Sequence, residues 1–456
     1  MRKSRKISQK EHTMKNLDAM IQNPIVIKAG GGPMSTPESI AEFVSYANSN
    51  SQNRIFVLSA PGRTENSDKI TDILISCYNQ AIRSEDFTKT FGPLADRFIE
   101  IAEFFGIDSL DIYLAQIWTK LYNLRKAPES TSYDWIIAQG EYAISKIVAE
   151  ILGATLINPA ECIFLGQNGQ IMEKTYKMLQ EKLSDKTRRY VIPGFVGADQ
   201  NGKLKLFPRG WSDVSGSIVA KAVKGLYVNL KDVRGIAVAD PRIIGKNVIY
   251  LESLTYGQAL ELTNSGNQVL HPATIGPAED SNTVIRIVSV FQPDAPGTTV
   301  SRYSDTKMLA LTGCPKCVAF HVYKRGIDNT VGFGEATLKI LRKCGISFEH
   351  VTTGQQDLTV TLLQSEVDKV GTDNLHELFQ KRLKAKIDHF PLATVSIVSI
   401  GREIDSALIF QIAAKIDEIG AKFRIISKAS DRSLTIGVDQ SEYEMVIRKL
   451  YPICIT

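Results

Sequence analysis

Residues 207–242, FPRGWSDVSGSIVAKAVKGLYVNLKDVRGIAVADPR, are the stretch that decides the fold. A turn with Arg209 and Asp213 opens an amphipathic helix, and a short strand follows and ends at Asp232. A second turn then carries an Asp-Pro-Arg sequence. Arginine can bind a carboxylate or phosphate through two parallel hydrogen bonds. Two such turns at the ends of neighbouring α/β elements indicate a site for an anionic small molecule beside a nucleotide.

Composition indicates an ordinary globular protein. The 456 residues are 43% hydrophobic and 23% charged, a length sufficient for two or three domains. Formal net charge is +5, and residues 1–15, with six basic residues and one acid, account for all of it. We therefore interpret residues 1–22 as a flexible basic tail, and the near-neutral remainder gives no reason to expect nucleic-acid binding.

The chain is expected to be cytoplasmic. No run approaches the roughly 18 apolar residues that a membrane helix needs, and the tail lacks the apolar region of a secretory signal. The cysteines are too scattered for a disulfide framework. Cys314 and Cys317 form a CxxC, but no second pair completes a zinc site, so two semi-buried thiols beside a turn are the favoured interpretation.

From residue 24 to about 300, short apolar runs alternate with segments of helical periodicity. Strands are predicted at 25–27, 55–58, 155–157 and 190–192. Helices are predicted at 35–45, 70–84, 91–105, 109–124 and 142–152. Continuous apolar strands between helices predict an α/β domain over residues 23–300, a mostly parallel sheet sandwiched by helices. Ligands of such sheets bind at the carboxyl ends of the strands.

The turn-rich segment 293–306 reads as a linker, and two βαββα units follow it. Their strands are predicted at 307–318, 346–352, 358–363, 395–400, 421–426 and 433–438. Their helices are predicted at 334–345, 374–383, 404–420 and 440–450. This weak repeat predicts two ferredoxin-like modules, residues 307–390 and 391–456. Neither module has a phosphate loop or an acid cluster, which favours binding or regulation.

Three segments of the first domain carry candidate site residues. Lys28 precedes Gly30, Gly31 and Gly32 at a strand-to-helix turn, where backbone N–H groups can approach phosphate and the lysine can meet a transferring phosphoryl group. A purely structural turn is the alternative. Ser59 follows the second strand and could hold substrate. Glu141 starts an apolar helix and could bind an ammonium group or complement the helix dipole.

The opening stretch adds further candidates. Asp213 could cap its helix, but Arg209 makes a ligand role the better interpretation. Asp232, Asp240 and Arg242 complete the set. An aspartate could hold Mg²⁺ through water, and the arginine could lie on a nucleotide phosphate.

These motifs occur in the order found in the amino-acid kinase family. The matching segments are Lys28–Gly32, Leu58-Ser59-Ala60, Gly140-Glu141, 193–197 (PGFVG), 209–213 (RGWSD), 232–235 (DVRG), 239–242 (ADPR) and 269–272 (VLHP). From residue 25 to about 450 the chain resembles aspartate kinases of that family. The C-terminal repeat resembles the paired ACT domains with which such kinases sense end-product amino acids.

The resemblance implies phosphoryl transfer from ATP, with Mg²⁺, to the side-chain carboxylate of L-aspartate, giving 4-phospho-L-aspartate. This is the first step of aspartate-family amino-acid biosynthesis (lysine, threonine and methionine). Lys28 and Asp213 would be catalytic. Residues that would bind the substrate are Ser59, Glu141, Arg209 and Ser212. Residues that would bind the nucleotide are Gly30, Gly31, Gly32, Asp232, Asp240 and Arg242. The resemblance assigns no metal-ligating residues.

The motifs also differ from the family pattern. The differing positions are Ala29, Gly32, Trp211, Lys231 and Gln268. Trp211 replaces a glycine beside Arg209, so its indole is expected to reshape the substrate pocket or stack over it. Two alternatives therefore remain beside aspartate kinase: an acyl-phosphate kinase for another amino acid, and a catalytically impaired ligand-sensing relative.

The resemblance also predicts partners. An amino-acid effector, lysine or threonine, is expected at the ACT-like modules, in a homodimer or larger homo-oligomer. The candidate effector loops are 401–406 and 332–334, for which ordinary strand-to-helix turns are the alternative.

Overall fold

The structure is a computed structural model that describes residues 23–107, 110–126, 132–208, 210–327, 330–430 and 432–455. The predicted tail, 1–22, lies outside this part. The chain divides into two compact units. The first takes in residues up to 236 together with 250–259 and 269–304, and the second takes in 237–249, 260–268 and the residues from 305 on.

The first unit is built on a sheet in the strand order β3-β4-β2-β1-β7-β9-β10-β8. Its strands are β1 (Ile25–Ala29), β2 (Asn53–Leu58), β3 (Thr155–Leu156), β4 (Tyr190–Pro193), β7 (Leu226–Lys231), β8 (Ser253–Thr255), β9 (Ile285–Ser289) and β10 (Thr298–Ser301). Neighbouring strands are parallel except β9 and β10, which are antiparallel. The predicted mostly parallel sheet is confirmed.

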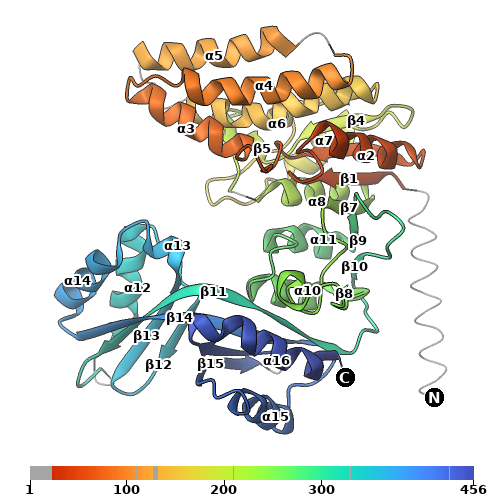
Figure 1. Cartoon of the computed structure of the whole chain (residues 1–456). Helices are drawn as coiled ribbons and strands as arrows, with labels where there is room; N and C mark the ends of the chain where they lie inside the picture. The colour runs from red at the N-terminus through yellow and green to blue at the C-terminus, as the bar shows by residue number, and fades with distance from the viewer. Residues whose placement is uncertain are drawn as a thin grey trace, which may run out of the picture. The chain divides into compact units, whose positions relative to one another are not determined.

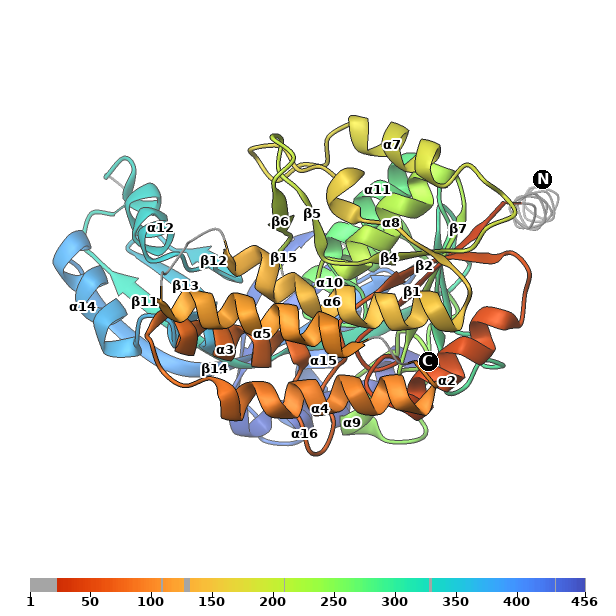
Figure 2. The ribbon, with the colours of Figure 1, turned by 90° about the horizontal axis from the view of Figure 1, so that it is seen from above.

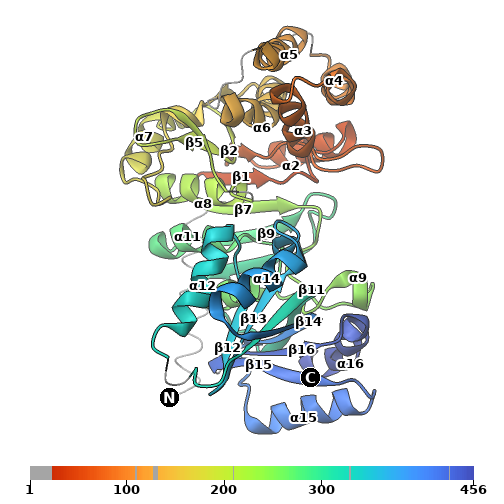
Figure 3. The ribbon, with the colours of Figure 1, turned by 90° about the vertical axis from the view of Figure 1, so that its left-hand side faces the viewer.

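Helices cover both faces of this sheet. They are α2 (Pro37–Asn48), α3 (Ile70–Ile82), α4 (Thr88–Phe104), α5 (Leu110–Lys126), α6 (Ser132–Ile151), α7 (Lys174–Lys182), α8 (Ser212–Val223) and α11 (Ile275–Ser281), with short 3₁₀ turns at Pro159–Glu161 and Pro272–Thr274. Helices α3 to α6 gather at one end of the unit (Figure 1). Figures 2 and 3 show α7, α8 and α11 on one side of β1, β2 and β7, and α2 on the other. A hairpin of β5 (Val196–Ala198) and β6 (Leu204–Leu206) lies outside the main sheet.

The central strands are apolar because both of their faces are covered. β2 buries Ile55, Phe56, Val57 and Leu58. Phe56 packs edge-on against Phe43 of α2, with ring centroids 5.7 Å apart. Burying such side chains stabilises the fold by roughly 1.5–3 kcal/mol each. This core fixes the strand ends that carry the candidate site.

The second unit contains a six-stranded antiparallel sheet within the described residues, ordered β12-β13-β11-β14-β16-β15. Its strands are β11 (Met308–Tyr323), β12 (His350–Thr353), β13 (Asp357–Leu363), β14 (Lys386–Ile400), β15 (Phe423–Ser430) and β16 (Ser433–Val438). Its helices are α9 (Pro241–Ile244), α12 (Phe333–Cys344), α13 (Gln364–Val367), α14 (Thr372–Leu383), α15 (Ser406–Asp417) and α16 (Tyr443–Ile455), the last after a 3₁₀ turn at Gln440–Glu442. α10 (Tyr256–Asn264) contributes residues to both units. Figure 1 shows α12 and α14 toward one end of the sheet and α15 and α16 toward the other.

Two strands of this sheet are much longer than predicted. β11 and β14 pair along their whole length, from Met308 opposite Ile400 to Tyr323 opposite Lys386. The predicted strands, 307–318 and 395–400, cover only part of β11 and β14. The register breaks between Cys314 and Cys317, so a bulge accommodates Pro315 and the strand continues. The predicted division at residue 390 stays a prediction, since β11 and β14 run through both halves of the sheet.

No helix in the described part of the chain is long and apolar enough to cross a membrane.

Candidate active site

A buried cluster of three charged side chains lies at the carboxyl ends of β1 and β7. Lys28 is the penultimate residue of β1, and its Nζ lies 2.7 Å from Asp213 Oδ1. Lys231 ends β7, and its Nζ lies 3.0 Å from Asp213 Oδ2 and 3.2 Å from Oδ1. Asp213 stands in the first turn of α8 and is 6% exposed. One carboxylate therefore holds two ammonium groups.

Burial and mutual attraction set the ionisation of this cluster. Burial would raise the pKa of Asp213, but the two ammonium groups of Lys231 and Lys28 hold it well below its usual range. Burial lowers the pKa of Lys28 to about 8, and repulsion from Lys231 lowers it while Asp213 raises it. Asp213 is thus ionised at neutral pH, and the cluster carries an excess of positive charge.

Asp213 does not cap its helix. Trp211 occupies the N-cap position of α8, and no side-chain hydrogen bond to this cap is present in the described residues. The main chain of Asp213 is fixed by Tyr227 of β7, whose hydroxyl donates a hydrogen bond of 2.9 Å to the Asp213 carbonyl oxygen. Of the two interpretations of Asp213, we therefore prefer a role in ligand binding to a role as the helix cap.

The glycine turn after Lys28 is tightly packed. The Gly62 N–H donates to the Gly31 carbonyl at 2.8 Å, and a Cβ on Gly62 would come within 2.7 Å of Gly31. A Cβ on Gly32 would lie 2.9 Å from Asp232 Oδ2. Glycine at position 32 therefore makes room for the Asp232 carboxylate, and the turn and Asp232, both predicted nucleotide-binding elements, lie side by side.

Glu141 is a buried carboxylate with an unsatisfied oxygen. It lies on α6, is 4% exposed, and its Oε2 has no hydrogen-bond partner among the described residues. Burial raises the pKa of Glu141 to about 8, opposed by hydrogen bonding from the Ala60 backbone. One turn along α6, the buried Ser145 hydroxyl is also without a partner in the described chain. A buried polar pair of this kind is typical of a ligand site.

The two predicted substrate-binding serines lie at neighbouring strand ends. Ser59 follows β2, is half-buried, and donates its N–H to the Ala29 carbonyl at 3.1 Å. Ser212 begins α8 and is 7% exposed. A Cβ on Gly194, which follows β4, would lie 2.9 Å from Ser212 Cβ. Close packing with Gly194 thus positions the start of α8 beside the end of β4.

Trp211 makes aromatic contacts beside this helix start. Its ring centroid lies 5.5 Å from that of Phe207 and 6.5 Å from that of His271. His271 Nδ1 accepts a hydrogen bond from the Ala273 N–H at 3.2 Å. The indole is thus held between a phenyl ring and an imidazole, and the expectation that it shapes the substrate pocket stays a prediction.

The remaining predicted residues divide between the units. Arg209 lies outside the described residues. Asp240 and Arg242 belong to the second unit, where Asp240 caps α9 and accepts from the Arg242 N–H at 2.8 Å. Their side chains form an ion pair of 2.6 Å, with the Arg242 side chain 88% exposed. The nucleotide roles of Asp240 and Arg242 stay predictions.

Lys231 is the site residue that sequence reasoning missed. The prediction noted it only as a departure from the family pattern. The signal that would have found it is the register of β1 against β7, because side chains alternate along a strand and adjacent parallel strands present the same faces together. β1 and β7 pair Lys28 with Asn229, so Lys231, two residues further on, faces the same way as Lys28.

Comparison with known proteins identifies the family. The model of the amino acid kinase family matches residues 23–289, more than half of the chain. The chain belongs to the amino acid kinase family. The predicted resemblance is confirmed, and the Lys28–Asp213 cluster lies within the matched segment.

Relatives in this family extend over both units. Aspartokinase 3 of Bacillus subtilis is 25% identical over 93% of this chain and 97% of its own length. The crystal structure of Clostridium acetobutylicum aspartate kinase aligns with a TM-score of 0.77 and 28% identity, covering 95% of this chain and all of that one. E. coli aspartokinase III in complex with aspartate and ADP aligns with a TM-score of 0.78 and 20% identity over 95% of this chain and all of that one. The predicted fold class is confirmed in both units.

Proposed function

We propose that this chain transfers the γ-phosphoryl group of ATP to the side-chain carboxylate of L-aspartate, giving 4-phospho-L-aspartate. The observation that carries the proposal is the Lys28–Asp213 pair, buried at the strand ends beside the glycine turn. Phosphoryl transfer to an acid needs positive charge on the transferring group and close backbone N–H groups, and this corner of the sheet offers both. The match to aspartate kinases along both units supports the choice of acceptor.

Lys28 is proposed to act directly on the phosphoryl group. The acceptor carboxylate is already ionised at pH 7, so no general base is required. Catalysis then consists of bringing two anions together and neutralising their repulsion. Lys28 supplies positive charge, and Asp213 fixes its ammonium at 2.7 Å. Gly30, Gly31 and Gly32 would line the phosphates, and because the Gly30 N–H already donates to the Leu230 carbonyl, the N–H groups of Gly31 and Gly32 would make the contacts.

The amino-acid side is proposed to centre on Glu141. Its unsatisfied Oε2 is a ready acceptor for the substrate ammonium, and an arriving cation would favour the ionised carboxylate that burial alone disfavours. Ser59 and Ser212 would add hydrogen bonds. Arg209 would bind the α-carboxylate through two hydrogen bonds.

The nucleotide side is proposed to include Asp232 of the first unit, and nucleotide roles for Asp240 and Arg242 stay predictions from the sequence. Asp213 is poorly suited to a metal because both its oxygens already contact ammonium groups. No cluster of three or more His, Cys, Asp or Glu fit for a metal occurs in the described chain. That is compatible with Mg²⁺, which commonly binds through phosphates, waters and one carboxylate. Asp232 would then hold the ion, which supplies charge neutralisation at the phosphates.

An assay with ATP, hydroxylamine and candidate amino acids tests the reaction. Hydroxylamine displaces phosphate from an acyl phosphate to form a hydroxamate, which gives a coloured complex with ferric ion, so L-aspartate is expected to give hydroxamate, phosphate and ADP. Hydroxamate from a different amino acid only would favour the alternative acyl-phosphate kinase. ATP binding without turnover of any carboxylic amino acid would favour the ligand-sensing relative.

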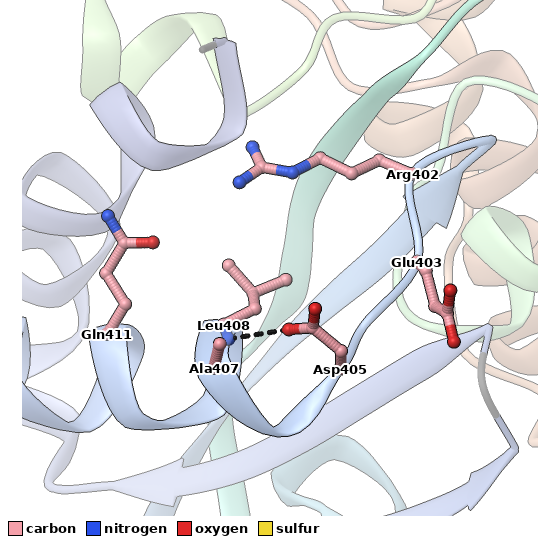
Figure 4. A pocket seen from close by; sticks show the side chains of 6 residues that line it. All are labelled: Arg402, Glu403, Asp405, Ala407, Leu408 and Gln411. Atoms are coloured by element: carbon pink, nitrogen blue, oxygen red, sulfur yellow. Dashed lines mark hydrogen bonds between the residues drawn. The ribbon is translucent and has the colours of Figure 1, made fainter.

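The second unit is proposed to bind an amino-acid effector. A pocket of about 340 Å³ is lined by Arg402, Glu403, Asp405, Ala407, Leu408 and Gln411, at the predicted effector loop 401–406 (Figure 4). Asp405 caps α15 through the Leu408 N–H at 2.8 Å. The Arg402 guanidinium donates to the Ile453 carbonyl at 2.7 Å. A cation and carboxylates around one space suit the two charges of a free amino acid, for which lysine and threonine are our candidates. E. coli aspartokinase III has also been solved in complex with lysine and aspartate.

Titration of lysine, threonine and methionine against activity tests the regulation. We expect one of them to inhibit, and Arg402→Gln to raise the concentration needed for half inhibition by about tenfold, the loss of one charged contact. If the inhibition of Arg402→Gln is unchanged, the effector binds at another site, such as the 332–334 turn. No response to any of the three would refute this choice of effectors.

We also propose a homodimer or larger homo-oligomer in the cytoplasm. The resemblance of the second unit to paired ACT domains supports the proposal, and Phe410 and Ile425 of that unit, 75% and 57% exposed, are apolar side chains that an interface between copies would cover. All six cysteines are free, which suits a reducing compartment. Sedimentation analysis at micromolar concentration tests the assembly, and a monomer throughout would contradict it.

A further inference from the structure

Lys231 is a partly buried cation that the proposed function leaves without a role. Its side chain is 16% exposed, compared with 5% for Lys28 and 8% for Asp213. Lys231 contacts both oxygens of Asp213, whereas the Lys28 ion pair is with Oδ1. Lys231 is thus the more accessible of two lysines that share one carboxylate.

Both lysines reach the glycine turn. A Cβ on Gly30 would lie 3.4 Å from Lys28 Nζ and 3.9 Å from Lys231 Cδ. The Gly30 N–H also donates to the Leu230 carbonyl, 3.3 Å away, which joins the turn to the end of β7. The Lys28 ammonium group and the Lys231 side-chain stem therefore lie beside the same part of the turn that is proposed to hold phosphate, and the Lys231 ammonium group is joined to that of Lys28 through Asp213.

The charges of the cluster are unbalanced. One lysine would neutralise Asp213, so the second leaves one positive charge in excess. The other acid that acts on Lys28 is Glu141, and burial favours its neutral form. An excess positive charge inside the protein lowers the free energy of unfolding unless an anion neutralises it. A phosphoryl group at the turn is an anion of the right sign and reach.

We propose that Lys231 binds the γ-phosphoryl group of ATP together with Lys28, and that Asp213 is the positioning residue that holds both ammonium groups. The contact with ATP stands independently of which acid accepts the phosphoryl group. Its contribution to transfer rests on the proposed function.

Affinity for ATP compared with ADP tests the contact without turnover. Lys231→Met is expected to weaken ATP binding by about 10- to 100-fold, the loss of one charged hydrogen bond, and ADP binding by less than about threefold. Lys231→Arg should recover most of the loss. Lys203→Met removes an exposed lysine outside the site and should leave both affinities unchanged. Equal losses for ATP and ADP, or no loss for either, would overturn the proposal.

Kinetics separate this role from simple charge balance. With aspartate as acceptor, Lys231→Met should lower kcat by about 100-fold and leave KM for aspartate nearly unchanged. Loss of the repulsion between the lysines should also raise the pKa of Lys28, whose other charged neighbours are Asp213 and Glu141. The alkaline limb of the pH profile should therefore move to higher pH. If Lys231 merely neutralises Asp213, the variant will unfold more easily but keep kcat, the ATP preference and the pH profile.

The outcomes also distinguish the two proposals. If Lys231→Met selectively loses ATP affinity while the wild type forms no aspartyl hydroxamate, then Lys231 binds ATP but aspartate is not the acceptor. If Lys231→Met turns over aspartate normally, then aspartate is the acceptor but Lys231 does not have the proposed role. Lys231→Gln, which retains length and polarity, provides the same test if the methionine variant does not fold.

Discussion

The two units differ in the polar groups that they bury. The first buries charged side chains, namely Lys28, Arg97, Glu141 and Asp213. In the described part of the second unit, the buried polar side chains are hydroxyls only: Thr263, Thr312, Thr337, Thr361, Thr394, Ser396 and Thr435. Burying a charge costs much more free energy than burying a hydroxyl that finds a partner. The parallel-sheet unit thus buries charges that lower its stability but are available for chemistry. The antiparallel unit is stabilised mainly by apolar packing.

Within the first unit, the buried charges are of two kinds. Arg97 donates hydrogen bonds to the carbonyl oxygens of Ser35, Gly62 and Asp68 at 2.6, 2.5 and 3.1 Å. Its charge is thus satisfied by the backbone and ties together the loops around the glycine turn. Glu141, by contrast, keeps an oxygen without a partner in the described chain. The contrast separates a structural charge from one that awaits a ligand.

The largest effect is expected from Asp213→Asn. The change leaves two lysines buried without a counter-charge, so kcat should fall by about 1,000-fold or more and the free energy of unfolding by roughly 3–5 kcal/mol. Coupled assays and urea denaturation measure the two effects. Asp280→Asn removes an exposed ion pair with Lys221 and should change stability by less than about 1 kcal/mol. An active Asp213→Asn protein would show that the cluster is not the reaction centre.

Phe379→Ala tests the packing side of the comparison. Phe379 is fully buried in the apolar cluster of the second unit, 5.5 Å from the Phe320 ring. Its truncation should cost roughly 3–5 kcal/mol of stability, whereas kcat at a temperature where the variant is folded should be unchanged. Phe379→Leu, which leaves a smaller cavity, should cost less. A fall in kcat of the folded variant would contradict the division of labour between the units.

Glu141→Gln is expected to act mainly on the amino acid. Loss of the charged contact with the substrate ammonium should raise KM for aspartate by about 30-fold or more, roughly 2 kcal/mol, and change KM for ATP little. Glu150→Gln, an exposed change on the same helix, is the matched control. An equal rise in both KM values would contradict the proposed role of Glu141.

The smallest effect, taken per pH unit, is a pH dependence of stability. The Glu141 pKa is raised from 4.5 to about 8, so its favourable contribution is complete below pH 4.5 and is lost as pH rises toward 8. Lys28 and Asp213 titrate outside the range between pH 5 and 7. Over that range, wild type should lose up to about 1.4 kcal/mol of stability per pH unit relative to Glu141→Gln. Urea denaturation at pH 5, 6 and 7 measures this slope, and parallel curves would show that Glu141 is not desolvated.

The sequence predicted those parts of the molecule that local chemistry determines. The apolar runs of β1 and β2 and the glycine turn after Lys28 are local signals, and so the parallel sheet and its ligand-binding edge were predicted. The full length of β11 was not, because residues 319–323 are held in the strand by pairing with distant residues of β13 and β14. The role of Lys231 depends on the register of β1 against β7, which no single segment contains.

The continuous pairing of β11 with β14 has a consequence for hydrogen exchange. The same two strands pass through both halves of the six-stranded sheet, pairing from Met308 opposite Ile400 to Tyr323 opposite Lys386 with one interruption at the bulge between Cys314 and Cys317. Neither half can open fully without displacing strands that the other half shares. The amide protons of the two halves should therefore exchange through one common opening, so that a ligand seated in either half slows exchange in both.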